Sequence, residues 1–153
     1  MKKNAMLNVK GLRRAEGEDD EVVDFITEAE FFVEDDFYAV EYKESELTGM
    51  DGTLTRIEFK ESGVSIIRTG TNPSHLVFEP GKRHVTMYDT GVGMLEIAVR
   101  SDFVDSNLSE NGGVAEFNYY IEINGQEASY NEFEMKVTEA VRKDECYESY
   151  SEC

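Results

Sequence analysis

Apolar residues recur at every second position along several stretches of this chain. In the first clear stretch, one face carries Val23, Phe25, Thr27, Ala29, Phe31 and Val33, and the other carries Asp24, Glu28, Glu30 and Glu34. Three further stretches repeat the pattern with the apolar series Leu95, Ile97, Val99, Ser101, Phe103, then Phe117, Tyr119, Ile121, Ile123, then Phe133, Met135, Val137. A period of two with one polar face predicts antiparallel strands that bury one face in a core.

Turn signals separate these stretches at short intervals. The strongest is Asn124-Gly125, because it lies between two alternating segments and both residues tolerate a positive φ. The spacing of the turns predicts roughly eight to ten strands joined mostly by tight hairpins. We therefore expect an all-β fold, a closed antiparallel up-and-down barrel, because closure of so long a meander removes exposed sheet edges.

The alternating pattern ends near residue 138, which suggests one barrel domain over residues 1–138 and an acidic C-terminal tail over 139–153. The tail is polar, and we expect it to be mobile or to form a short helix. Both cysteines of the chain, Cys146 and Cys153, lie in it. They form no disulfide framework, and this usage fits a reducing compartment.

The charge balance restricts the classes of partner. Fifteen basic and thirty-three acidic residues give a formal charge of −18, which repels phosphate backbones and anionic membrane surfaces. The charged start of the chain is followed by no apolar stretch typical of a signal peptide, and no run of apolar residues is long enough to span a membrane. We expect a cytoplasmic protein that binds neither nucleic acid nor membranes.

Several short segments carry a resemblance to a known family. They are Tyr42-Lys-Glu-Ser-Glu-Leu-Thr-Gly-Met-Asp-Gly-Thr53, Arg68-Thr-Gly70, Phe78-Glu-Pro-Gly-Lys-Arg-His84, Tyr88-Asp-Thr-Gly-Val-Gly93 and Gly112-Gly113. In order and spacing they resemble the bacterial YwiB-like proteins, a family without an assigned function, over most of residues 4–138. The resemblance implies a calycin-like barrel, related in shape to lipocalins, and it implies no catalytic residues.

An inward-facing ion pair is the most specific site that the pattern predicts. Tyr42 shares a face with two other apolar or aromatic residues, and the period of two places Glu44 on that same inward face. Arg68 follows Val64 and Ile66 on the inward face of another strand. A buried carboxylate needs a partner, and a guanidinium matches its geometry. The pair can anchor a ligand, or it can fix strand register and bind nothing.

Two further side chains are candidates for the same site. Tyr88 is a possible hydroxyl donor to the pair, as is Tyr42 itself. His84 shares a face with Thr86 and Tyr88, but the opposite choice, with Val85 and Met87 inward, fits the pattern almost as well. The spacing of His84 and His75 matches no metal motif, so we predict no metal site, no cofactor and no catalytic residue.

The function that these features favour is a non-catalytic binding module. Its partner is either a small ligand inside the barrel or a protein on the outer surface, and the pattern leaves the oligomeric state open. The alternative is an enzyme that works at the barrel mouth around Glu44, Arg68 and Tyr88.

Overall fold

A computed structural model of the chain describes residues 1–46, 49–71 and 73–139. This part of the chain forms ten strands: β1 (Lys2–Arg14), β2 (Glu21–Val33), β3 (Phe37–Lys43), β4 (Thr53–Lys60), β5 (Gly63–Gly70), β6 (Ser74–Phe78), β7 (Arg83–Asp89), β8 (Met94–Ser106), β9 (Gly112–Ile123) and β10 (Gln126–Glu139). The strand content confirms the all-β prediction. No helix in the described ranges is long and apolar enough to cross a membrane.

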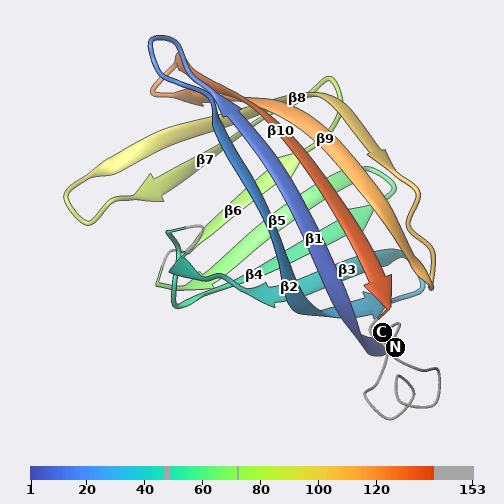
Figure 1. Cartoon of the computed structure of the whole chain (residues 1–153). Coiled ribbons are helices and arrows are strands. Elements are labelled where there is room, and N and C mark those ends of the chain that lie inside the picture. The colour runs from blue at the N-terminus through green and yellow to red at the C-terminus, as the bar shows by residue number, and fades with distance from the viewer. Residues whose placement is uncertain (47–48, 72, 140–153) are drawn as a thin grey trace, which may run out of the picture.

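The ten strands form one antiparallel sheet that curls into a nearly closed barrel (Figure 1). Each strand pairs with its sequence neighbours, and β1 pairs with β10, so that the two ends of the meander meet. The ring is interrupted between β6 and β7, which stand at the two edges of the sheet. There, an isolated bridge between Pro80 and Ser101 links the chain after β6 to β8. The β7–β8 hairpin extends away from the remaining strands.

The predicted hairpin at Asn124-Gly125 joins β9 to β10. Asn124 has a φ of 50° and Gly125 a φ of 84°. Two consecutive positive φ angles are typical of the turn whose twist matches that of the flanking strands. The turn sets the first pairs of the β9–β10 ladder, and an irregularity between Glu127 and Ser129 then shifts the register by one residue, which brings Phe117 opposite Phe133.

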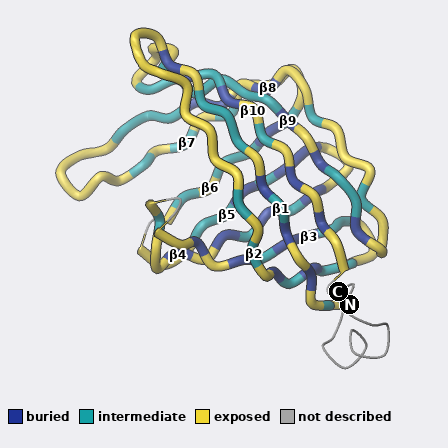
Figure 2. The backbone as a smooth tube through the Cα atoms, in the orientation of Figure 1, coloured by how far each residue is buried: buried dark blue, intermediate teal, exposed yellow. Residues whose placement is uncertain are grey.

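The core lies inside the barrel, where buried positions alternate with more exposed ones along much of β1, β4 and β10 (Figure 2). Aromatic rings fill much of it. Phe117 packs against Phe133 with ring centroids 4.8 Å apart and against Phe78 at 4.9 Å. Because Phe78 belongs to the edge strand β6 and Phe117 to β9, this contact crosses the interior behind the interruption.

One predicted core residue is on the wrong face. Ser101 pairs with Tyr119, but the next pair is Phe103 with Asn118, so Asp102 is an extra residue that forms a β-bulge. The bulge reverses the alternation: Phe103 is 45% exposed on the outer face, and Val104 packs against the core in its place. The prediction of Phe103 as a core residue is therefore wrong, since a bulge shifts every later side chain to the other face.

The predicted boundary between barrel and tail falls at the end of β10. Glu139, assigned to the tail from the sequence, pairs with Ala5 as the last residue of this strand. The remainder of the predicted tail, with Cys146 and Cys153, lies outside the described residues.

Two alanine substitutions test the bulge. Phe103→Ala should change the free energy of unfolding by less than about 1 kcal/mol, as for an exposed residue. Phe117→Ala should cost about 3–5 kcal/mol, because it opens a cavity in the aromatic core. Urea unfolding of both variants measures the difference, and equal losses would place Phe103 in the core after all.

Candidate functional site: a polar row at the barrel mouth

The candidate site lies at the end of the barrel where β1, β3, β5, β7 and β9 finish. The chain places four polar residues there on adjacent strands. Tyr42 of β3 pairs with Thr55 of β4, and Thr55 pairs with Arg68 of β5. All three lie at inward positions, so the sheet aligns a phenol, a hydroxyl and a guanidinium in one row. Glu44 follows directly after β3 and completes this polar row.

Glu44 is buried at the centre of the row. Its backbone N–H donates to the carbonyl oxygen of Thr53 at 2.8 Å, which extends the β3–β4 pairing past the end of β3 and keeps the side chain inward. Only 1% of this side chain is exposed. The hydroxyls of Thr55 and Tyr42 both donate hydrogen bonds to its carboxylate. Such donors compensate the carboxylate for the water it loses on burial.

Arg68 supplies the opposite charge, as the alternation predicts. Its Nε lies 3.8 Å from Oε2 of Glu44, and 20% of its side chain is exposed. At this distance the two groups form an ion pair without a direct hydrogen bond, and within the described part of the chain Nε has no hydrogen-bond partner. The charge of Glu44 therefore holds the guanidinium at the inner wall, where Nε is buried and the rest of the side chain is partly exposed.

The row changes the titration of the nearby tyrosines. Burial raises the pKa of Tyr42 well above its ordinary value, the charge of Glu44 raises it further, and the charge of Arg68 opposes both effects. Burial also raises the pKa of Tyr119, which the charge of Arg68 partly offsets. Both phenols are therefore protonated at neutral pH and can act as hydrogen-bond donors.

Two cavities open beside the row. The first has a volume of about 340 Å³, and its wall includes Tyr42, Glu44, Tyr119, Phe25 and Phe133. The second, of about 600 Å³, lies toward β6 and β7 and is lined by apolar residues that include Leu76, Ile97, Ile121 and Ile123. Arg68, Arg13 and Met50 line both cavities. Together they form one mouth cavity with the two arginines at its centre, in the size range of ligand pockets.

The structure brings three of the five predicted site residues together and a fourth close to them. Tyr42, Glu44 and Arg68 are in contact, and Tyr88 lines the larger cavity with Arg68. His84 lies elsewhere, in a separate pocket of about 150 Å³ between β6 and β7 that it shares with His75. Its Nε2 is 3.0 Å from Oε1 of Glu79.

The burial of β7 decides between the two orientations that the pattern allowed. His84, Thr86 and Tyr88 are half-buried, whereas Val85 and Met87 are exposed. His84 and Tyr88 therefore face inward. Among the described residues, no three histidine, cysteine or acidic side chains cluster in a way that could hold a metal ion.

Three residues of the mouth were not predicted. Thr55 shares the inward face of β4 with Thr53 and Ile57. The same period of two places Arg13 on the face of Val9 and Gly11 in β1. The alternation could therefore have found both. Tyr119 belongs to a predicted core face, and only the position of Arg68 across the barrel makes its hydroxyl part of the site.

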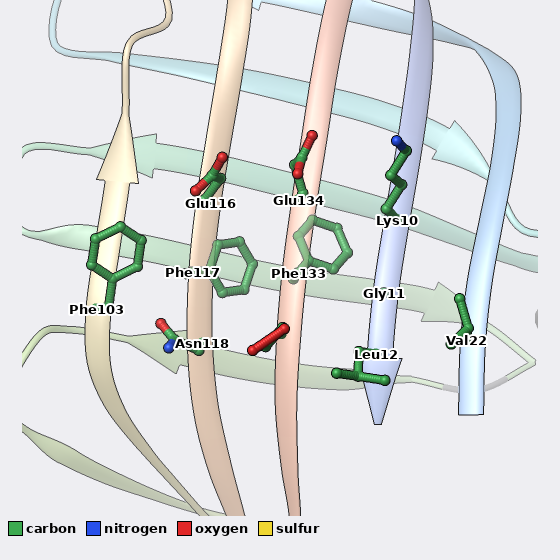
Figure 3. Close-up of a pocket in the computed structure, with 11 residues that line it drawn as sticks. Lys10, Gly11, Leu12, Val22, Phe103, Glu116, Phe117, Asn118, Phe133 and Glu134 are labelled. Atoms are coloured by element: carbon green, nitrogen blue, oxygen red, sulfur yellow. The ribbon is translucent and has the colours of Figure 1, made fainter. Parts of the chain in front are cut away.

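A third hollow, of about 380 Å³, lies on the outer face of the sheet (Figure 3). The bulged residue Phe103 borders it together with Leu12 and Val22, and Glu116, Glu134 and Lys10 add exposed charges. These charged groups lie at outward positions and are solvated. They lack the burial and mutual contacts that distinguish the polar row, so we place the candidate site inside the barrel.

Comparison with known proteins supports the predicted resemblance. A family model described as "Domain of unknown function (DUF1934)" matches residues 7–135. The crystal structure of the YwiB protein from Bacillus subtilis superposes with a TM-score of 0.75 and covers 92% of this chain and 94% of its own, at 18% sequence identity. At this identity the likeness shows the shared fold alone. No curated protein matches the chain.

Loss of either charge of the pair should affect stability unequally. Arg68→Met should cost about 3 kcal/mol, because it leaves the buried carboxylate of Glu44 without a counter-charge. Glu44→Gln should cost about 1–2 kcal/mol, since the partly exposed guanidinium can turn to water. The double change should cost less than the sum of the two.

Urea unfolding of the two single variants and the double variant measures this coupling. Arg100→Met is the matched control, because Arg100 is exposed and pairs with Glu127 on the surface. It should cost less than about 1 kcal/mol. Additive effects of Glu44→Gln and Arg68→Met would show that the two groups do not interact.

Tyr42 should make the protein sensitive to alkali. Its raised pKa keeps it protonated in the folded state above about pH 10, where a tyrosine of the unfolded chain ionises. The folded state then binds more protons, so its stability is complete below that pH and falls as the pH rises. Tyr42→Phe should lose less unfolding free energy than the wild type between about pH 9 and 11. Val40→Ala, a buried change without a titrating group, should keep the wild-type slope; equal slopes for all three would contradict the assignment.

Proposed function

This chain belongs to the DUF1934 family of domains of unknown function, and we propose that it is a non-catalytic binding module that holds a small anionic ligand in its mouth cavity. One observation carries the proposal: Arg68 lines both parts of the cavity and is oriented by a buried carboxylate. A charged group with unused donors in a largely apolar cavity is the usual means of orienting a ligand.

Two arginines, Arg13 and Arg68, are the groups at the mouth that can bind an anion, and four carboxylates, those of Glu21, Glu44, Asp89 and Glu132, line the same cavity. Arg68 lines both parts of the cavity with a side chain that is 20% exposed, and its buried Nε–H donates to no group among the described residues. Arg13 of β1 lines the same cavity and lies 3.9 Å from Glu18 and Glu21, at the outer limit of an ion pair. A carboxylate or phosphate between the two arginines gains charge-assisted hydrogen bonds, which are the strong ones.

The polar row acts as a support for the ligand rather than as a catalyst. The carboxylate of Glu44 accepts hydrogen bonds from Tyr42 and Thr55 and faces Arg68, which leaves it poorly placed to accept a proton from a substrate. Tyr42 holds its own proton because its pKa is raised. A general base needs a pKa near the operating pH.

The test is native mass spectrometry of the full chain isolated from its own cells. We expect a population with one bound small molecule, which dissociates at high collision energy. Arg68→Met should lose this population, and the matched surface variant Arg100→Met should retain it. Wild-type protein that is free of ligand after gentle isolation, or equal retention by both variants, would overturn the proposal.

A further inference from the structure

The interruption of the barrel leaves backbone groups of β7 without a sheet partner. At the end of the β7–β8 hairpin, the N–H of Thr90 donates to the carbonyl of Gly93 at 2.9 Å. Hydrogen-bonded and non-hydrogen-bonded pairs alternate along an antiparallel ladder. Counting back from this turn, the pairs Met87–Glu96 and Val85–Ala98 are non-hydrogen-bonded. The N–H and C=O groups of Met87 and Val85 therefore point away from β8, toward β6.

The opposite strand confirms this count. Glu96 directs both of its backbone groups away from β7: its carbonyl accepts from the N–H of Asn124 at 2.8 Å, and its N–H donates to Oδ1 of Asn124 at 3.1 Å. Within the described ranges, no ladder joins β6 to β7. A row of unpaired N–H and C=O groups is a template for an added strand.

This free edge borders the larger part of the mouth cavity. Thr86, Met87 and Tyr88 of β7 form one wall of that part, Leu76 of β6 lies across from them, and Arg68 stands at its inner end. The small pocket beside His84 continues the gap toward Val85. A ligand in this space meets three kinds of group at once: backbone donors and acceptors, an apolar wall, and a guanidinium.

We propose that the ligand of the mouth cavity is a short peptide with a free C-terminal carboxylate. Its backbone adds as a strand to the free edge of β7, an apolar side chain packs on Ile97 and Ile121, and its carboxylate reaches Arg68. This inference rests on the proposed function and specifies the ligand class. Strand addition to an open edge, with side chains in pockets, is an established mode of peptide recognition.

A peptide uses more of the site than other anions of similar size do. An aliphatic carboxylate fills the apolar wall and pairs with Arg68, but it leaves the N–H and C=O groups of Met87 and Val85 unpaired. A peptide backbone can make hydrogen bonds to these groups that an aliphatic carboxylate cannot make. A peptide strand can pair with the backbone groups of Val85 and Met87, which are two residues apart, because every second residue of the peptide directs its own N–H and C=O to the same side.

The experiment measures fluorescence anisotropy of a labelled hexapeptide of alternating threonine and valine that ends in leucine. The probe with a free carboxylate should bind the full chain, and the same probe with a C-terminal amide should bind at least about tenfold more weakly. N-methylation of one alternate set of backbone amides should abolish binding. N-methylation of the other set should leave it nearly unchanged, because only one set faces β7.

Protein variants test the same contacts from the other side. Met87→Pro removes the free-edge N–H without removing a hydrogen bond to β8, and it should abolish peptide binding. Met94→Pro is the matched control on the same hairpin, because Met94 is 55% exposed and Met87 is 57% exposed. This control variant should bind the peptide as the wild type does. Arg68→Met should weaken binding of the probe with a free carboxylate and leave binding of the probe with a C-terminal amide unchanged.

Decanoate distinguishes failure of this inference from failure of the proposed function. If decanoate binds in an Arg68-dependent manner and neither hexapeptide binds, the cavity holds anions that are not peptides, and this inference alone is overturned. Equal binding of the two N-methylated probes would overturn it as well. If no probe binds and native mass spectrometry detects no bound molecule, both proposals fail.

Discussion

The contact of Phe78 with the rings of β9 is the interaction on which the barrel depends. No ladder joins β6 to β7 among the described residues, so hydrogen bonds do not close the ring there. Phe78 instead packs across the interior against Tyr119, at 4.6 Å between centroids, and against Phe117, at 4.9 Å. A barrel of about eight strands is just wide enough for its side chains to fill. This wider barrel fills part of its interior with aromatic rings and leaves a cavity between these rings and the mouth.

The polar row is the second constraint, and it has a direct consequence for the mouth. A buried carboxylate such as that of Glu44 is stable only with donors and a counter-charge around it. Thr55, Tyr42 and Arg68 supply these from three neighbouring strands, and in return their own side chains are held in place. The cavity therefore has a fixed wall of charge before any ligand arrives, and such preorganisation reduces the cost of binding.

The interruption and the polar row together account for the two proposals. An uninterrupted ladder between β6 and β7 would pair the free edge and cover the larger cavity. Without the Glu44–Arg68 pair, the cavity would be an apolar hollow with no preferred end for a ligand. The incomplete ring therefore provides access, and the ion pair provides orientation.

The alternating pattern by itself determined the all-β class, the Asn124-Gly125 hairpin and the inward directions of Glu44 and Arg68, because each depends on residues within one strand or turn. Tertiary structure decided the rest. The outward turn of Phe103 depends on how β8 pairs with β9, and the interruption depends on where β6 and β7 stand in the ring. The convergence of Arg13 with Arg68 joins strands distant in sequence. A period of two fixes the face of a side chain, but only strand pairing fixes its neighbours.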